Sequence, residues 1–278
     1  PDMRVIQHSE VLDVVDFHHS QERFHLLDCT TCGFRMTFPQ PKGPSMGRYY
    51  ASSEYLSHES AGKSLTAAIY RTVRSARLAT KHKLIRGFAP SGRLLDVGCG
   101  TGELIAFLAT KGYAVEGVEP GSKASARAKQ NHLLKVSPSL EDIPLQEQFQ
   151  CITLWHVLEH LPDLQGSFRR LNALLAPNGY LFVAVPDRSS WDAQHYGPYW
   201  AAWDVPRHLW HFRQRDVHQL LQAHGFTLVR TNRMWLDAYY IALLSEQIEE
   251  TEVAPVGLGH ANRNLVKSVR LDTEPPIF

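Results

Sequence analysis

A glycine-rich turn, lying between an apolar run and a helical pattern, is the feature that most constrains how this chain folds. Residues 94–107 read LLDVGCGTGELIAF, with Gly98, Gly100 and Gly102 at alternate positions. The apolar residues before the turn predict a buried strand, and those after it predict a helix. Glycines in such a unit let a ligand approach the backbone closely near the helix N-terminus. We therefore expect a ligand-binding site at this turn.

Strand and helix patterns alternate along the chain after the turn. The predicted strands cover residues 93–97, 114–118, 134–137, 150–156, 180–185 and 226–231. The predicted helices cover residues 102–111, 122–132, 163–176 and 213–224. The strands are continuous apolar runs, as expected when helices cover both faces of a sheet. The alternation predicts an α/β fold with a doubly wound, mostly parallel sheet.

The rest of the chain divides around this core. We expect an irregular N-terminal segment over residues 1–58, a helical cap over 59–89, the core over 90–235 and a helical C-terminal extension over 236–278. The cap carries a basic stripe, formed by Arg71, Arg74, Arg77 and Lys81. This stripe is either a solvated helix face or a lip that steers an anionic substrate.

Composition argues against several classes of function. The formal net charge of +1 gives no electrostatic case for a nucleic-acid partner. No apolar run approaches the roughly 20 residues that a membrane-spanning helix needs. Four cysteines in 278 residues do not indicate a disulfide framework, and two of them, Cys99 and Cys151, lie in the glycine turn and in a predicted strand. We therefore expect a cytoplasmic protein with reduced thiols.

The residues around the turn limit the ligand. The spacing is G-x-G-x-G, whereas dinucleotide-binding folds have G-x-G-x-x-G. Asp96 precedes the turn and Glu103 opens the helix, so two carboxylates would repel a pyrophosphate. They suit a ligand that carries a positive charge and hydroxyl groups. In a doubly wound sheet such a ligand binds at the carboxyl ends of the strands.

DVGCGTG at residues 96–102, followed by Glu119 in VEGVEP, resembles the motifs of class I S-adenosylmethionine-dependent methyltransferases. The resemblance extends from about Arg93 to Thr231 and implies a Rossmann-like sheet of seven strands. It implies that Asp96 lies near the methionine amino group, that Glu119 binds both ribose hydroxyls and that Asp142 meets the adenine amino group. The cofactor-binding residues that it implies are Asp96, Gly98, Cys99, Gly100, Gly102, Glu119, Pro120, Asp142, Trp155 and His156.

The segment after the fourth predicted strand, LWHVLEHLPD, has the spacing H-x-x-E-H. It resembles E-x-x-E-H in the ubiquinone-pathway and small-RNA 2′-O-methyltransferases, where the motif binds a divalent metal. Here His156 stands in place of the first glutamate. The resemblance implies a metal held by His156, Glu159, His160 and either His208 or His211. Two nitrogens and one carboxylate favour zinc, iron or manganese over magnesium.

A second interpretation of these residues is open. Many class I methyltransferases have EHL at this point without a metal, and Glu159 and His160 then cap and pack. In that case His156 or His208 is the natural general base, because the unperturbed pKa of histidine is near neutral. Both histidines are therefore candidate catalytic residues.

Residues 191–212, WDAQHYGPYWAAWDVPRHLWHF, have the most unusual composition in the chain and contain four of its six tryptophans. The segment is too long for an ordinary loop. One interpretation is a lid or substrate wall that suits an aromatic, sugar-like or lipid-tailed acceptor. The other is a small additional core that covers the edge of the sheet.

Cys29-Thr30-Thr31-Cys32-Gly33 has the form of half a zinc site. Some related bacterial methyltransferases carry an N-terminal zinc ribbon that ends in C-x-x-C-G-F and a proline-rich stretch, as in CGFRMTFPQP here. Such a ribbon needs a second cysteine pair. That pair was lost, lies before Pro1, or is replaced by His18, His19 or His25. Cys29 and Cys32 are therefore candidate ligands of a structural zinc.

We interpret the chain as a methyltransferase that uses S-adenosylmethionine to methylate an oxygen of a small-molecule acceptor by in-line transfer. The alternative is a non-catalytic adenosylmethionine-binding module that holds a partner through residues 191–212. The glycine turn is compatible with both. A nicotinamide-dependent oxidoreductase is disfavoured by the glycine spacing.

Overall fold

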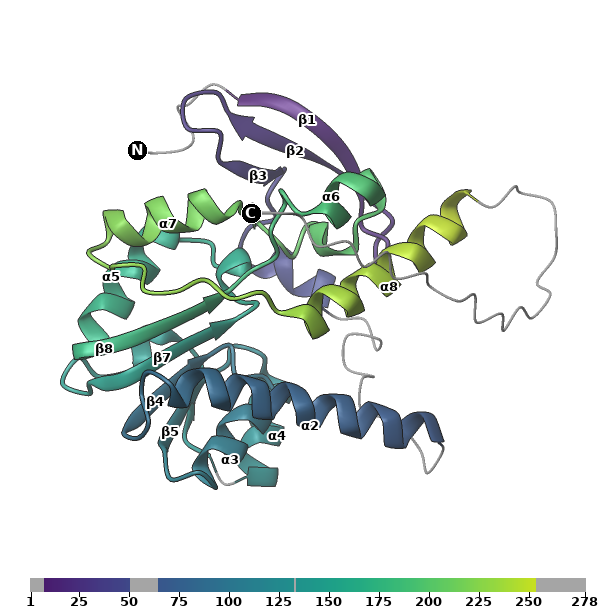
Figure 1. Cartoon of the computed structure of the whole chain (residues 1–278). Coiled ribbons are helices and arrows are strands. Elements are labelled where there is room, and N and C mark those ends of the chain that lie inside the picture. The colour runs from purple at the N-terminus through teal and green to yellow at the C-terminus, as the bar shows by residue number, and fades with distance from the viewer. Residues whose placement is uncertain (1–7, 51–64, 133, 254–278) are drawn as a thin grey trace, which may run out of the picture.

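Parallel strands form the central sheet of the computed structural model, which describes residues 8–50, 65–132 and 134–253 (Figure 1). The sheet has five strands in the order β6-β5-β4-β7-β8. They are β4 (Arg93–Val97), β5 (Ala114–Val118), β6 (Val136–Ser137), β7 (Phe149–Trp155) and β8 (Leu175–Ala184). The predicted doubly wound α/β fold is confirmed. Within the described residues the sheet has five strands, not the seven that the resemblance implied.

Helices cover both faces of this sheet because neighbouring residues of a strand point to opposite sides. On one side Leu94 and Cys151 pack with α2, α3 and α4. On the other side Leu95 and Ile152 pack with α5 and α7. These helices are α2 (Leu65–Arg86), α3 (Glu103–Ala109), α4 (Ser122–His132), α5 (Leu164–Leu174) and α7 (Gln214–Ala223). The arrangement is a three-layer α/β/α core.

The carboxyl ends of β4 and β7 lie side by side at one edge of the sheet. β4 pairs with β5 on one side and with β7 on the other, and Val97 of β4 is opposite Leu154 of β7. The direction in which successive strands are added reverses at β4, and doubly wound sheets bind ligands at such a reversal. The glycine turn after β4 and the histidines after β7 therefore meet at this edge.

The N-terminal segment is not irregular, so this part of our prediction was wrong. β1 (His8–Val15), β2 (Arg23–Cys29) and β3 (Arg35–Phe38) form an antiparallel sheet with β9 (Trp210–His211). In β2 the buried side chains of Phe24 and Leu26 alternate with more exposed positions. His25 lies between them, but β1 (HSEVLDVV) does not alternate strictly, and β3 has only four residues. The apolar alternation was therefore too weak to predict strands from the sequence.

Residues 226–231, which we predicted as a strand, have no regular structure. Phe226 still packs against Phe168 of α5, but Leu228 and Val229 are exposed, and no described strand pairs with this run. The helix predicted for the following tail is α8 (Trp235–Val253), which packs against α6 (Trp191–Tyr196) (Figure 1). Residues 59–64 of the predicted cap and 254–278 of the predicted extension lie outside the described residues. Among the helices that are described, none is both long and apolar enough to cross a membrane.

A buried arginine joins the N-terminal sheet to the segment that precedes β9. Arg207 is only 2% exposed and contacts Asp16 Oδ1 at 2.9 Å and Asp204 Oδ1 at 2.6 Å. Its guanidinium also donates to the backbone carbonyl of Tyr49 at 3.0 Å. Three parts of the chain that are distant in sequence thus converge on one cation. Removing that cation leaves buried carboxylates without compensation, which is strongly destabilising.

We expect the Arg207→Met variant to lose about 3–5 kcal/mol of unfolding free energy, because Asp16 and Asp204 keep their charge in a buried place. Urea unfolding followed by circular dichroism measures the loss. The control is Arg48→Met, which removes an exposed ion pair with Glu22 and should cost less than about 1 kcal/mol. Equal losses in the two variants would contradict the role of Arg207.

Candidate functional site

The glycine turn after β4 is shaped partly by packing and partly by open space. Gly98 has φ +71°, and a Cβ there would lie 2.4 Å from Cγ2 of Val157, so the protein itself requires this glycine. Gly100 has φ +55°, but a Cβ there would meet no atom within 4 Å. Gly102 is the N-cap of α3. The space beside Gly100 is thus the part of the turn where a ligand can approach the backbone.

Glu119, at the end of β5, is held against this turn by two backbone N–H groups. Gly100 N donates to Oε2 at 2.9 Å, and Gly121 N donates to Oε1 at 2.7 Å. Each carboxylate oxygen keeps a further lone pair for an outside donor. A carboxylate fixed in this way suits a pair of neighbouring hydroxyl groups, as on a ribose.

Asp96 is a buried carboxylate at the end of β4. It is 4% exposed, and its Oδ1 accepts a hydrogen bond from Thr153 Oγ1 at 2.5 Å. Burial raises its pKa to about 6, although Thr153 and the nearby Lys81 lower it. An anion that the protein compensates only in part favours a cationic ligand group beside it. The ammonium of an amino-acid ligand meets this requirement.

The other predicted cofactor residues differ in what they can contribute. Cys99 is buried, and burial raises the pKa of its thiol to about 12, so it is a neutral core residue. Its backbone N–H already donates to Val118 O at 3.0 Å. Asp142 uses Oδ2 to accept bonds from the backbone N–H and the hydroxyl of Ser139, which is a cap for the short helix 140–142. Pro120 is exposed at the end of β5.

His156 lies directly after β7 with φ +58°, and two carboxylates face its ring. Its Nε2 is 3.2 Å from Asp237 Oδ2, and its Nδ1 is 3.7 Å from Glu159 Oε1. Burial lowers the pKa of His156, but the two carboxylates outweigh burial and raise it to about 9. In this arrangement His156 is an imidazolium at neutral pH. It therefore lacks the basic nitrogen that we expected of a general base.

Sequence reasoning missed the partner of His156. Asp237 lies in the first turn of α8, is 7% exposed and also contacts Arg77 of α2 at 2.5 Å. Asp237 of α8 thus contacts both Arg77 of α2 and His156, the residue that follows β7. The only sequence signal was an aspartate in an otherwise apolar helical turn, MWLDAYY, which is too common to indicate a site.

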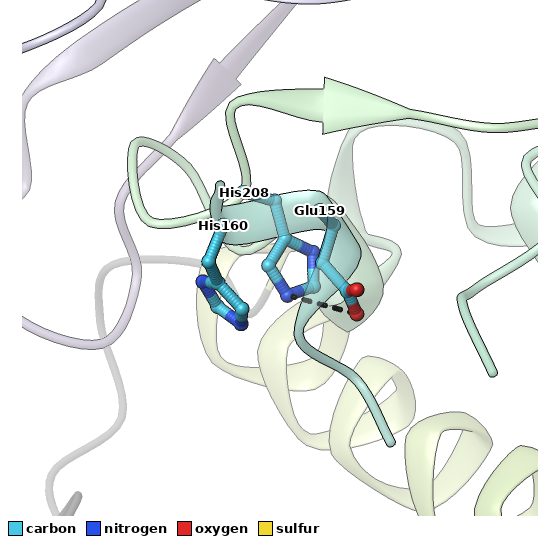
Figure 2. A group of neighbouring side chains, drawn as sticks. All are labelled: Glu159, His160 and His208. Atoms are coloured by element: carbon cyan, nitrogen blue, oxygen red, sulfur yellow. Dashed lines mark ion pairs between the residues drawn. The ribbon is translucent and has the colours of Figure 1, made fainter. Parts of the chain in front are cut away.

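Glu159, His160 and His208 form a compact group beside β7 (Figure 2). Each offers one ligand atom, and these atoms all lie within 4.8 Å of one another. The imidazole rings of His160 and His208 have centroids 4.6 Å apart, and His208 Nε2 is 3.9 Å from Glu159 Oε1. Figure 2 shows the short turn that carries Glu159 and His160 beside the chain that brings His208.

Hydrogen bonds orient both rings of this group. His160 Nδ1 is 2.9 Å from the carbonyl oxygen of Arg207, and His208 Nδ1 is 2.8 Å from that of Ala202. A carbonyl only accepts, so each Nδ1 carries the hydrogen and each Nε2 keeps its lone pair. Metal-binding histidines are oriented by their second nitrogen in the same way. Burial, then the neighbouring His208, lowers the pKa of His160 to about 4, which keeps it neutral.

The buried carboxylate of Glu159 is the feature of this group that most favours a bound cation. It is 1% exposed, and neither of its side-chain oxygens has a hydrogen-bond partner among the described residues. Burial raises its pKa, but His156, His208 and His160 outweigh burial and lower it, so the group stays charged. A buried carboxylate without hydrogen bonds, next to two imidazole lone pairs, fits a divalent metal. The neighbouring Asp204, whose Oδ2 is 3.8 Å from His208 Nε2, was not predicted.

Other residues that we predicted as metal ligands lie outside this group. His211 Nε2 bonds to Thr37 Oγ1 at 2.9 Å. Cys29 ends β2 and Cys32 lies in the turn before β3, where Cys32 N donates to Cys29 Sγ at 3.4 Å. In the part of the chain that the structure describes, no metal-ligating group of three includes either cysteine.

The aromatic segment 191–212 is mostly a core. Trp200, Trp203 and Trp210 are buried, whereas Trp191 is 67% exposed. Trp200 and Trp203 pack with Phe24 of the N-terminal sheet and with other buried residues of that region. Of the two interpretations, the additional core therefore describes most of the segment. By packing in this way, it also brings His208 to the metal-ligating group.

Residues 70–231 match the sequence profile of a methyltransferase domain family. The match covers more than half of the chain and includes the glycine turn, Glu119 and the residues after β7. The chain belongs to this family. It is a class I methyltransferase, and its cofactor is S-adenosylmethionine. The buried Asp96, the carboxylate of Glu119 and the space beside Gly100 fit the ammonium, ribose and backbone-facing parts of that cofactor.

Individual relatives agree with the family. The chain is 29% identical over 154 residues to a ubiquinone biosynthesis O-methyltransferase of Rhodopseudomonas palustris, covering 52% of this chain and 61% of that one. It is 36% identical over 104 residues to a ubiquinone biosynthesis O-methyltransferase of Coxiella burnetii, covering 34% of this chain and 44% of that one. A magnesium protoporphyrin IX methyltransferase of Synechocystis, solved with SAH (S-adenosylhomocysteine), superposes with TM-score 0.52 at 16% identity over 68% of this chain and 92% of that one. The last likeness shows the fold alone.

We expect Asp96→Asn to raise the melting temperature of this methyltransferase without ligand, and to raise it more at pH 7.5 than at pH 4.5. The pKa of Asp96 is about 6 in the folded chain, above its ordinary value of 3.8. Ionised Asp96 therefore destabilises the fold increasingly as pH rises from about 4 to 6, and constantly above. Above pH 6 the ionised carboxylate lowers the free energy of unfolding by on the order of 3 kcal/mol.

Thermal unfolding at the two pH values measures this difference. The control is Asp163→Asn, at an exposed helix cap where asparagine also caps well, so little change is expected at either pH. A gain in Asp96→Asn that is the same at both pH values would show that the charge of Asp96 is not the cause.

Proposed function

We propose that this methyltransferase transfers the methyl group of S-adenosylmethionine to a hydroxyl oxygen of a small molecule. The observation that carries the proposal is the buried group of Glu159, His160 and His208, which lies beside β7 and suits a cation that binds oxygen. The curated relatives are named O-methyltransferases, and this chain spans only 61% and 44% of the two described above. In the transfer the S–CH₃ bond breaks, an O–CH₃ bond forms, S-adenosylhomocysteine is released and the hydroxyl proton passes to water.

The cofactor half of the site consists of Asp96, Gly100 and Glu119. Asp96 binds the ammonium of the methionine moiety, and Glu119 accepts hydrogen bonds from both ribose hydroxyls. Trp155, at the end of β7, contributes a flat apolar surface next to the amino-acid end. Asp142 has one carboxylate oxygen in a helix cap, so only its Oδ1 is left for the adenine amino group.

The acceptor half of the site is the metal-ligating group. Glu159, His160 and His208 hold a divalent metal, with zinc, iron or manganese preferred over magnesium because two ligands are imidazoles. Such a metal supplies Lewis acidity that lowers the pKa of a hydroxyl bound to it. His156 supports the group as an imidazolium that faces Glu159 and keeps its carboxylate ionised. A metal that gathers neighbouring oxygens favours a diol or catechol acceptor.

Both residues that we predicted as catalytic keep a role in this proposal. His208 binds the metal through Nε2, because its Nδ1–H is bonded to the carbonyl of Ala202. His156 contributes its positive charge and its position between Asp237 and Glu159. Proton uptake by His156 is not part of the mechanism.

We expect Glu119→Gln to weaken binding of S-adenosylhomocysteine about tenfold or more, because a charged acceptor of the ribose hydroxyls becomes neutral. Isothermal titration calorimetry measures the change. Glu250→Gln, at an exposed position of α8, is the control and should bind like the wild type. If Glu119→Gln binds with unchanged affinity, the ribose assignment is wrong.

We expect tag-free protein, purified without chelators and reconstituted with Zn²⁺, Fe²⁺ or Mn²⁺, to retain about one metal ion per chain. His160→Ala should lose it, since one of the three ligands is gone. Mass-spectrometric elemental analysis gives the metal content. His132→Ala, at an exposed position of α4, is the matched control, and Cys29→Ser tests whether the cysteine turn holds the metal instead.

The same samples test the acceptor. Wild-type protein should transfer labelled methyl groups from S-adenosylmethionine to a catechol more readily than to a simple phenol or an amine, and His160→Ala should lose this preference. Absence of metal in all reconstituted samples, or methylation of the amine alone, would overturn the proposal.

A further inference from the structure

Helix α8 has apolar residues on its buried side and on its exposed side. On the buried side Ile241 and Ala242 pack against the aromatic cluster of residues 191–212, and Ser245 Oγ accepts from Ala201 N at 2.9 Å. On the exposed side lies a stripe of large apolar side chains, formed by Trp235, Leu236, Tyr239, Tyr240 and Leu243. A helix that is apolar all round is normally buried, so this exposed stripe indicates a contact surface.

The exposed stripe is symmetric about its centre. Tyr239 and Tyr240 are neighbours at the centre, and Leu236 and Leu243 each lie three residues farther out. Two copies of α8 that run antiparallel across a two-fold axis at this centre place Tyr239 opposite Tyr240, and Leu236 opposite Leu243. A two-fold contact is self-complementary, because the same pair of residues meets twice. The stripe therefore fits the stripe of a second copy of this chain.

The charged residues beyond the stripe follow the same symmetry with opposite sign. Arg233 lies three residues before the first leucine of the stripe, and Glu246 lies three residues after the last one. Arg230 and Glu249 lie three residues farther out again. Arg230, Arg233 and Glu246 are exposed, and the guanidinium carbon of Arg233 is 5.6 Å from the ring centroid of Trp235. In the antiparallel arrangement each arginine faces a glutamate of the other copy, which fixes the register of the contact.

The same charges argue against a lipid surface as the occupant of the stripe. A helix that lies on a membrane has basic residues beside its apolar face, and these attract anionic headgroups. α8 contains no basic residue, and its C-terminal half carries Glu246, Glu249, Glu250 and Glu252. An anionic membrane would repel these glutamates, whereas the arginines of a second copy attract them.

We propose that the protein is a homodimer in which the α8 helices of two copies pack antiparallel through the exposed stripe. Arg233 of each copy pairs with Glu246 of the other. Asp237 is buried on another side of α8, so the dimer leaves its contact with His156 in place. The inference does not depend on the proposed acceptor or metal.

The test is sedimentation velocity of the full chain without cofactor, metal or acceptor. The wild type at about 100 µM should have twice the mass of one chain, since even a Kd in the micromolar range leaves mostly dimer. Tyr239→Asp places a charge at the apolar centre and should weaken the dimer more than about 100-fold. The control is Leu145→Asp, which changes an exposed leucine outside α8 and should leave the dimer unchanged. Circular dichroism should show that both variants are folded, because both positions are exposed.

Charge reversal tests the antiparallel register. Arg233→Glu places glutamates opposite each other, and Glu246→Arg places arginines opposite each other, so each variant should dimerise about 10- to 100-fold more weakly. An equimolar mixture of the two variants should dimerise like the wild type, because every pair between unlike chains again has opposite charges. Arg169→Glu, at an exposed position of α5, is the control and should not change the dimer.

Three outcomes would overturn the inference: a monomeric wild type, a Tyr239→Asp variant that dimerises like the wild type, or a mixture of charge variants that dimerises no better than its components. A monomer that binds phosphatidylglycerol vesicles, and loses this binding in Tyr239→Asp, would assign the stripe to a lipid surface. A monomer that dimerises only after removal of residues 254–278 would assign the stripe to that part of the chain. Because no cofactor or metal is present, failure of the proposed O-methylation would leave the result intact.

Discussion

The pairing of β4 with β7 is the constraint on which the site depends. Val97 is opposite Leu154, so Asp96 and the residues after Trp155 leave the sheet at the same edge. Parallel strands make this possible because their carboxyl ends all point the same way. The glycine turn continues from β4 into α3, and Glu119 arrives from β5 on the other side. A shift in the β4–β7 register would separate the two halves of the site.

Buried charges without full compensation mark both halves. Burial raises the pKa of Asp96, and Glu159 has no hydrogen-bond partner among the described residues. Groups like these destabilise a fold unless a ligand compensates them. In the proposed function the cofactor ammonium compensates Asp96, and a divalent metal compensates Glu159.

The sequence predicted features that depend on a few neighbouring residues. The glycine turn and the parallel strands follow from local patterns, and the structure and the family match agree with them. The role of Glu119 also follows from a local pattern and stays a prediction. The N-terminal sheet was missed because its strands alternate weakly and because β3 pairs with Trp210–His211, which are distant in sequence. Asp237 was missed for the same reason, since only tertiary packing brings it to His156. Asp204 lies only four residues before His208, but no motif in the sequence singled it out. The grouping of His208 rather than His211 with Glu159 also depends on packing and on Thr37, which binds His211.

The two halves of the site differ in how they are held together. The cofactor half depends on the central sheet and α2. The acceptor half depends on the N-terminal sheet, because β3 pairs with β9 and the Thr37 hydroxyl donates to the carbonyl of His208 at 2.6 Å. Arg207 links this sheet to Asp204, and its own carbonyl accepts from His160 Nδ1–H. Changes that loosen the N-terminal sheet should therefore weaken the metal-ligating group before they affect cofactor binding.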